Sequence, residues 1–149
     1  ALNSYCSQRY SNYVIHRGYF ADSIDPPFLR SLEEYPPVLI WIDCDYYSSA
    51  RTVLERLVDF MPNGCVIYFD ELDNINFGSR LTGEARLVAE INAGLLGPNL
   101  ELVPDLRLSL QSGRIYRFFR LPANRMLLHP EAENAADQVR HRSDGSPLP

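Results

Sequence analysis

Two short apolar runs dominate the hydrophobic pattern in the middle of the chain. Residues 38–42 read VLIWI and residues 65–69 read CVIYF, and each run stops at an acidic residue, Asp43 or Asp70. Uninterrupted apolar runs of this length, without the alternation of a half-exposed strand, are typical of strands buried on both faces. The pattern therefore predicts two central strands of a sheet, with Trp41 in the core.

Between and after these runs the apolar residues follow a helical spacing. Residues 48–61 place apolar side chains on one face from Val53 to Met61, with Ser48 or Ser49 as a candidate N-cap. Residues 83–95 predict a second helix. Helical crossovers of this length join parallel neighbouring strands, so an α/β sheet is expected. The predicted buried side of the second helix consists of Ala85, Val88, Ala89 and Ile91.

The flanking segments complete the expected order of elements. Val14–His16 predicts a short strand, and the segment between Pro26-Pro27 and Pro36-Pro37 predicts a short helix. Residues 99–108 and 114–121 are strand-like, and their short connection favours an antiparallel pair at the sheet edge. We expect a Rossmann-like, mostly parallel α/β domain over residues 1–121, with flanking helices, and a disordered tail over residues 122–149.

Composition narrows the class of protein. The chain has 149 residues, of which 46% are hydrophobic, enough for one domain but not two. Its net charge of −5 disfavours nucleic-acid binding, which relies on basic side chains. No apolar run approaches the roughly 18 residues of a membrane span, and no signal-peptide pattern opens the chain, so a cytoplasmic protein is expected. The three cysteines, without metal-type spacing, are interpreted as small buried residues.

Carboxylates follow both predicted central strands directly. Asp43 ends one strand, and Asp70 and Glu71 end the other. If the strands are parallel neighbours, these side chains meet at one edge, where a divalent cation would relieve their repulsion. The alternative is that these acids are ordinary polar loop residues, and Asp45 in particular could cap the following helix. The residues alone leave both interpretations open.

The block from Asp43 to Glu71 resembles the metal-dependent class I S-adenosylmethionine methyltransferases of the macrocin O-methyltransferase type. The family pattern is Asp-x-Asp-x-Tyr-x-Ser after one strand, a helix, a Pro-x-Gly turn and a strand ending in Asp-Asp or Asp-Glu. Residues 18–24, GYFADSI, resemble the family's Gly-x-Phe-x-Asp-Thr element. The matching positions are Asp43, Asp45, Tyr47, Ser49, Pro62, Gly64, Asp70 and Glu71.

The resemblance implies O-methyl transfer to a hydroxyl of a small, sugar-like molecule, with S-adenosyl-L-methionine as methyl donor. It implies that Asp43, Asp70 and Glu71 hold Mg²⁺ or a similar cation, and that Asp43 or Asp45 accepts the hydroxyl proton. The residues that it assigns to the cofactor are Gly18, Tyr19, Phe20 and Asp22.

No glycine-rich cofactor loop precedes Tyr13, so we expect the chain to be the C-terminal portion of such an enzyme, inactive alone and prone to associate, for example as a homodimer. A non-catalytic α/β domain that retained an acidic metal-binding loop is the alternative. A hydrolase using Asp43 and Asp70 is disfavoured, because no Gly-x-Ser-x-Gly elbow or Walker loop is present.

Overall fold

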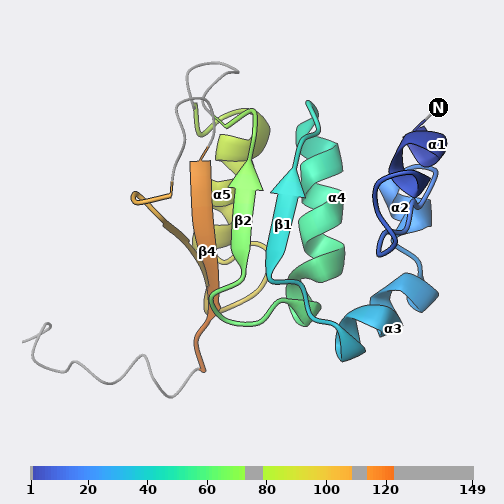
Figure 1. Ribbon diagram of the computed structural model, residues 1–149. Helices are drawn as coiled ribbons and strands as arrows, with labels where there is room; N and C mark the ends of the chain where they lie inside the picture. The colour runs from blue at the N-terminus through green and yellow to red at the C-terminus, as the bar shows by residue number, and fades with distance from the viewer. Residues whose placement is uncertain (1, 73–78, 109–113, 123–149) are drawn as a thin grey trace, which may run out of the picture.

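A single mixed sheet of four strands organises the protein (Figure 1). The computed structural model describes residues 2–72, 79–108 and 114–122. The strand order is β1-β2-β4-β3, with β1 and β2 parallel and β4 antiparallel to both of its neighbours. The strands are β1 (Leu39–Ile42), β2 (Val66–Phe69), β3 (Leu100–Pro104) and β4 (Arg114–Arg120). The α/β arrangement, the parallel central pair and the antiparallel edge pair are confirmed. The expectation of a mostly parallel sheet is wrong for the described strands, because β4 lies between β2 and β3 and runs antiparallel to both, so only the β1–β2 pairing is parallel.

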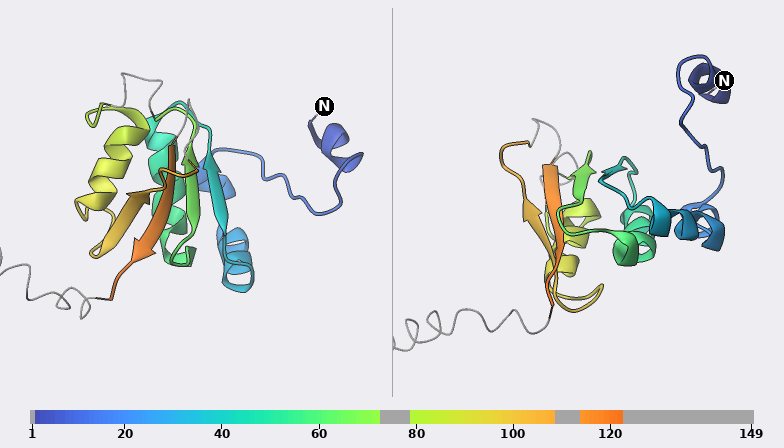
Figure 2. Two further views of the ribbon diagram at one scale, coloured as in Figure 1. Left: turned by 60° about the vertical axis from the view of Figure 1, so that its left-hand side comes forward. Right: turned by 60° about the horizontal axis from the view of Figure 1, so that its bottom comes forward.

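Two crossover helices cover one face of this sheet. Helix α4 connects β1 to β2, and α5 connects β2 to β3, and both lie on the same side of the strands (Figures 1 and 2). Within the described ranges, no helix is both long enough and apolar enough to cross a membrane. The helices are α1 (Leu2–Ser7), α2 (Phe20–Ser23), α3 (Pro26–Glu34), α4 (Tyr47–Leu57), the 3₁₀ turn η1 (Val58–Phe60) and α5 (Gly83–Asn92).

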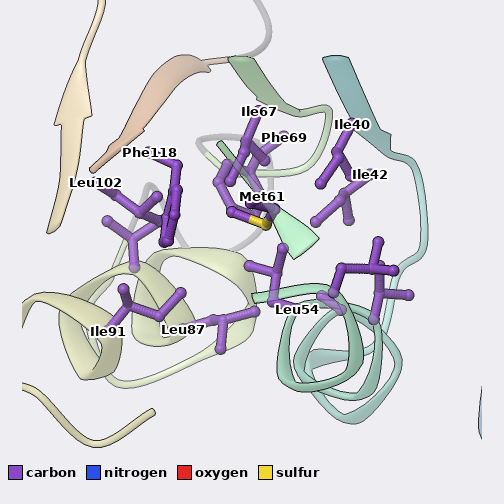
Figure 3. Packing of buried hydrophobic residues seen from close by; sticks show 14 of the residues in the cluster. Ile40, Ile42, Leu54, Met61, Ile67, Phe69, Leu87, Ile91, Leu102 and Phe118 are labelled. Carbon is purple, nitrogen blue, oxygen red and sulfur yellow. The ribbon is translucent and has the colours of Figure 1, made fainter. Parts of the chain in front are cut away.

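The core lies between the sheet and these two helices (Figure 3). Alternate residues of each strand point toward the helices, as the two-residue period of a strand requires. The strands contribute Ile40, Ile42, Ile67, Phe69, Leu102 and Phe118, and the helices contribute Leu54, Leu87 and Ile91.

The prediction that the first central strand is buried on both faces is wrong. Ile40 and Ile42 are buried, but Leu39 is 53% exposed and Trp41 is 57% exposed. Trp41 packs against the Tyr68 ring, with 4.1 Å between centroids, and is not a core residue. Helices α4 and α5 cover the face of Ile40 and Ile42 (Figure 3), whereas Leu39 and Trp41 on the opposite face of β1 are exposed to solvent.

Two further predictions about local structure are wrong. Val14–His16 has no strand structure, because within the described ranges no strand pairs with it, and β-branched residues need such pairing. Helix α4 has Tyr46 at its N-cap, without a side-chain capping bond, and not Ser48 or Ser49. The predicted helix between the proline pairs is confirmed as α3, where the Asp25 side chain accepts a hydrogen bond from the Phe28 N–H at 2.8 Å. The predicted tail, from residue 123 on, lies outside the described residues.

We predict that the chain associates through the exposed face of β1. Leu39, Trp41 and the neighbouring Val38 present apolar surface beside a strand edge, and both features favour self-association. Sedimentation velocity should show dimers or larger species, and Trp41→Lys should shift them toward monomer. A wild-type chain that remains monomeric and unfolds cooperatively contradicts this prediction.

Candidate functional site: an acidic rim at the ends of β1 and β2

Asp43 and Asp70 lie side by side at one end of the sheet. Ile42 pairs with Phe69 in the parallel register of β1 and β2, so the residues that follow leave the sheet together. The Asp70 N–H donates a hydrogen bond to the Ile42 carbonyl at 3.1 Å, so the pairing of the two strands continues as far as Asp70. The prediction that these acids end adjacent parallel strands is confirmed.

Asp70 and Glu71 are half-buried, whereas Asp43 is exposed. One Asp70 carboxylate oxygen, Oδ1, accepts a hydrogen bond from the Tyr68 hydroxyl at 2.7 Å. Tyr68 is itself buried in β2, so it fixes the orientation of Asp70 from within the sheet.

A fourth carboxylate, Glu84, joins this group from α5. It lies in the first turn of the helix and is only 3% exposed. Its Oε2 accepts a hydrogen bond from the Glu71 N–H at 3.1 Å, which places the carboxylate against the loop that follows β2. Its Oε1 is buried and has no hydrogen-bond partner among the residues that the structure describes. We call Asp43, Asp70, Glu71 and Glu84 the acidic rim.

Glu84 is the site residue that sequence reasoning missed. A glutamate in the first turn of a helix is a common, favourable and normally exposed residue. No local pattern distinguishes a buried one. The adjacency of its segment to an acidic loop was the available signal, and it becomes specific only once α5 is docked beside β2.

The electrostatics of the rim show how close these groups lie. Burial, together with the charges of Glu71, Asp70 and Asp43, raises the pKa of Glu84 to about 7. Burial, and then the charges of Glu84, Asp43 and Asp45, raise the pKa of the Cys44 thiol to about 11. Burial is the larger cause of both shifts, and the neighbouring carboxylate charges add to it, as expected where several acids gather at one edge of the sheet.

The donor chemistry of the rim fits a hard divalent cation. All four side chains offer carboxylate oxygens, which Mg²⁺, Mn²⁺ and Ca²⁺ prefer. The buried Glu84 Oε1 lacks a hydrogen-bond partner in the described part of the chain. In the part of the chain that the structure describes, no three His, Cys, Asp or Glu side chains converge closely enough to form a ready metal cage. The backbone brings the acids to one edge, and a shared cation would require the exposed Asp43 and the half-buried Glu71 to turn toward Asp70 and Glu84.

Asp45 lies on the turn between β1 and α4 and is exposed. The helix N-cap is Tyr46, and no side chain caps it, so the alternative that Asp45 caps α4 is wrong. The structure thus leaves Asp45 without a capping role, beside the acidic rim.

The predicted cofactor segment lies on the other side of α4. Gly18, with φ +130°, Tyr19 and Phe20 line a shallow cavity of about 260 Å³ together with Ser48, Ser49 and Thr52 of α4. Asp22 is exposed and does not line this cavity. The structure therefore brings three of the four predicted cofactor residues against the N-terminal turns of α4.

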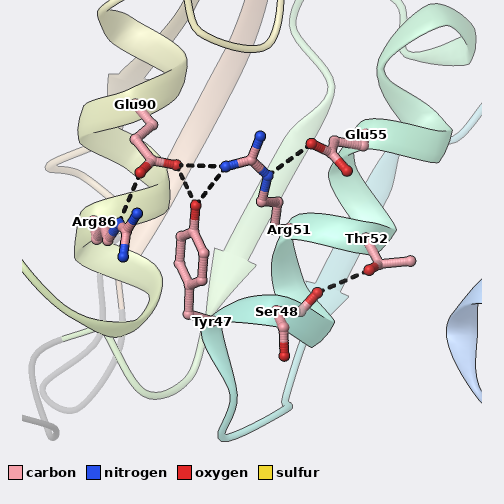
Figure 4. A network of polar contacts seen from close by, with 7 residues as sticks. All are labelled: Tyr47, Ser48, Arg51, Thr52, Glu55, Arg86 and Glu90. Atoms are coloured by element: carbon pink, nitrogen blue, oxygen red, sulfur yellow. Dashed lines mark hydrogen bonds and ion pairs between the residues drawn. The ribbon is translucent and has the colours of Figure 1, made fainter.

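Tyr47, the tyrosine of the Asp-x-Asp-x-Tyr-x-Ser pattern that begins at Asp43, links α4 to α5 (Figure 4). Its hydroxyl donates to Glu90 Oε2, and Arg51 Nη1 donates to the Tyr47 hydroxyl at 2.7 Å. Arg86 Nε bonds Glu90 Oε1 at 2.7 Å, and its guanidinium lies 4.3 Å from the centre of the Tyr47 ring. Because α5 carries Glu84, this network also helps to position the acidic rim.

Tyr47→Phe should destabilise the protein by about 2 kcal/mol, since it removes a hydroxyl that bonds two charged partners. Urea unfolding of both proteins measures this difference. Glu55→Gln is the control, because it breaks only the exposed Arg51–Glu55 pair on α4, and such pairs contribute roughly 0.5 kcal/mol or less. Equal stabilities of the two variants would show that the network does not join the helices.

Comparison with known proteins adds no relative. No protein family, curated protein or solved structure matches the chain. The functional argument therefore depends on the residues and their arrangement.

Proposed function

We propose that this chain is part of a divalent-metal-assisted O-methyltransferase that uses S-adenosylmethionine and acts on a hydroxyl of a small, sugar-like molecule. The observation that carries the proposal is the meeting of Asp43 and Asp70-Glu71 at the ends of adjacent parallel strands. Ligands of open α/β sheets bind beyond these carboxyl ends. The order of the strands, a parallel pair followed by an antiparallel pair, also supports the Rossmann-like fold that the resemblance implies.

Each part of the rim has a role in this proposal. Asp43, Asp70 and Glu71 would hold the cation, whose positive charge lowers the pKa of a hydroxyl that it contacts. Tyr68 would orient Asp70 through its 2.7 Å hydrogen bond. Asp43 or Asp45 would accept the proton of the acceptor hydroxyl, because both are exposed carboxylates at the same end of β1.

The methyl donor would supply its methyl group from a sulfonium. The chain would contribute alignment, because methyl transfer proceeds in line and needs the acceptor oxygen held close to the donor carbon. The segment Gly18–Phe20 and the N-terminal turns of α4 offer the shallow cavity for part of that donor. The glycine-rich loop that grips the donor in this class has no counterpart before Tyr13, so this chain alone should bind the donor poorly.

Isothermal titration with S-adenosylmethionine tests the proposal. A protein that joins this segment to a glycine-rich cofactor-binding half should bind the donor, and the 149-residue chain should bind it weakly or not at all. A joined protein that binds metal but not the donor would favour a non-catalytic α/β domain with a retained acidic metal-binding loop.

A further inference from the structure

We infer that Glu84 of α5 is a further ligand of the cation at the acidic rim, supplied by its unpartnered carboxylate oxygen Oε1. This inference deepens the proposed function and rests on its metal site. Neither the Asp-x-Asp motif nor the Asp-Glu pair after β2 contains this residue, which comes from a different element of the fold.

The first support is the free-energy cost of burying the Glu84 carboxylate with one oxygen unbonded. Glu84 is 3% exposed, and within the described ranges one of its carboxylate oxygens has no hydrogen-bond partner. An unpartnered buried polar atom is normally destabilising, and native proteins satisfy nearly all such atoms. Such an atom calls for an explanation, and a bound ion is one that suits a carboxylate oxygen beside three other acids.

The second support is position. Glu84 Oε2 accepts a hydrogen bond from the Glu71 N–H, so the whole carboxylate lies against the loop that carries Asp70 and Glu71. Asp70 in turn is hydrogen-bonded through its own N–H to the residue before Asp43. Three elements, β1, β2 and α5, therefore deliver acids to one place, and their sequence separation makes this a product of the tertiary fold.

The third support is that the orientation of Glu84 is fixed from both ends of α5. The hydrogen bond to Glu71 holds its carboxylate, and the Tyr47–Glu90–Arg86 contacts hold the helix against α4. A ligand on a docked helix is better oriented than one on a loop, which suits a cation that demands near-octahedral geometry such as Mg²⁺.

Mn²⁺ binding, followed by the EPR signal of the free ion and competed with Mg²⁺, tests the inference on the whole chain. Glu84→Gln keeps the size of the side chain and an oxygen that can accept from the Glu71 N–H, but it removes the charge. It should weaken Mn²⁺ binding by at least about tenfold. Glu101→Gln, at an exposed site on β3, is the matched control and should bind as the wild type does.

The outcomes separate this inference from the proposed function. If Glu84→Gln binds Mn²⁺ as wild type does, while Asp43→Asn loses binding, Glu84 is not a ligand and the metal site of the proposed function stands. If wild type binds no Mn²⁺, both the ligand role and the metal part of the proposed function are wrong.

A second measurement needs no substitution, and so holds even if the variant fails to fold. In ¹³C-labelled wild-type protein, the Glu84 side-chain carboxyl signal should shift on titration with Mg²⁺ together with that of Asp43. A Glu84 signal that stays in place while the Asp43 signal moves would overturn the inference.

Discussion

Asp43→Asn should lower methyl transfer by on the order of 10² or more in a protein that carries this segment together with the cofactor-binding half. The substitution removes a carboxylate that we propose as both metal ligand and base, and each of these contributions to rate is typically that large. The carboxamide is similar in size and the residue is exposed, so folding should be preserved. Donor affinity should change little, because the donor is held mainly by the glycine-rich half. Steady-state assays with and without chelator measure the effect.

Two further variants serve as a test of the proton acceptor and as a control for the Asp43→Asn result. Asp45→Asn tests the proton acceptor alone, since Asp45 does not cap α4 and a loss of activity cannot be assigned to a weakened helix. Asp59→Asn is the neutral control, because Asp59 is exposed and pairs only with Arg120 in the described ranges. If Asp43→Asn and Asp45→Asn both retain full activity and chelator has no effect, the acids are structural and the mechanism is wrong.

The stability of the metal-free chain should rise as the pH is lowered from about 8 to about 5. Glu84 has a pKa near 7 in the folded protein, raised by burial and by Glu71, Asp70 and Asp43, and an ordinary pKa of 4.5 when unfolded. The folded state therefore holds the proton more tightly than the unfolded state. The resulting stabilisation is complete below about pH 4.5 and is lost as the pH rises through about 7. A difference of this size corresponds to roughly 3 kcal/mol.

Urea unfolding in the presence of EDTA, at several pH values, measures this change. Glu84→Gln should abolish most of the pH dependence and should be more stable than wild type near pH 8, because no charge has to be buried. Glu101→Gln should retain the wild-type profile. Wild-type stability that is flat between about pH 5 and pH 8 would contradict the burial of a titrating Glu84. Below about pH 4 the opposite trend begins, since Arg117 holds the pKa of Asp105 below its ordinary value.

The urea unfolding experiment and the Mn²⁺ measurement should show opposite effects of the same substitution. Glu84→Gln should stabilise the metal-free protein and weaken its cation binding. A residue retained only for stability would not behave in this way, whereas a functional carboxylate held in an unfavourable place would.

The strands that end at Asp43 and Asp70, the crossover helices between the strands and the antiparallel pair at the edge could all be predicted from the amino-acid sequence. These features follow from the period and length of apolar runs and from short connections, which are local properties of the chain. The acids at the strand ends were also predictable, because parallel neighbours place their carboxyl ends at the same edge of a sheet.

Which surfaces of these elements are covered follows from how the elements pack, and the sequence did not show it. An apolar run such as VLIWI does not show whether one or both of its faces will be packed, and Trp41 is exposed because α4 and α5 pack on the opposite face of β1. The strand predicted at Val14–His16 is absent because strand formation needs a partner that local sequence does not supply. Glu84 became part of the site, and Tyr47 a link between α4 and α5, through contacts between residues distant in the chain. Burial and charge proximity are properties of the packed fold, so the fourth carboxylate of the acidic rim could not be found from the sequence.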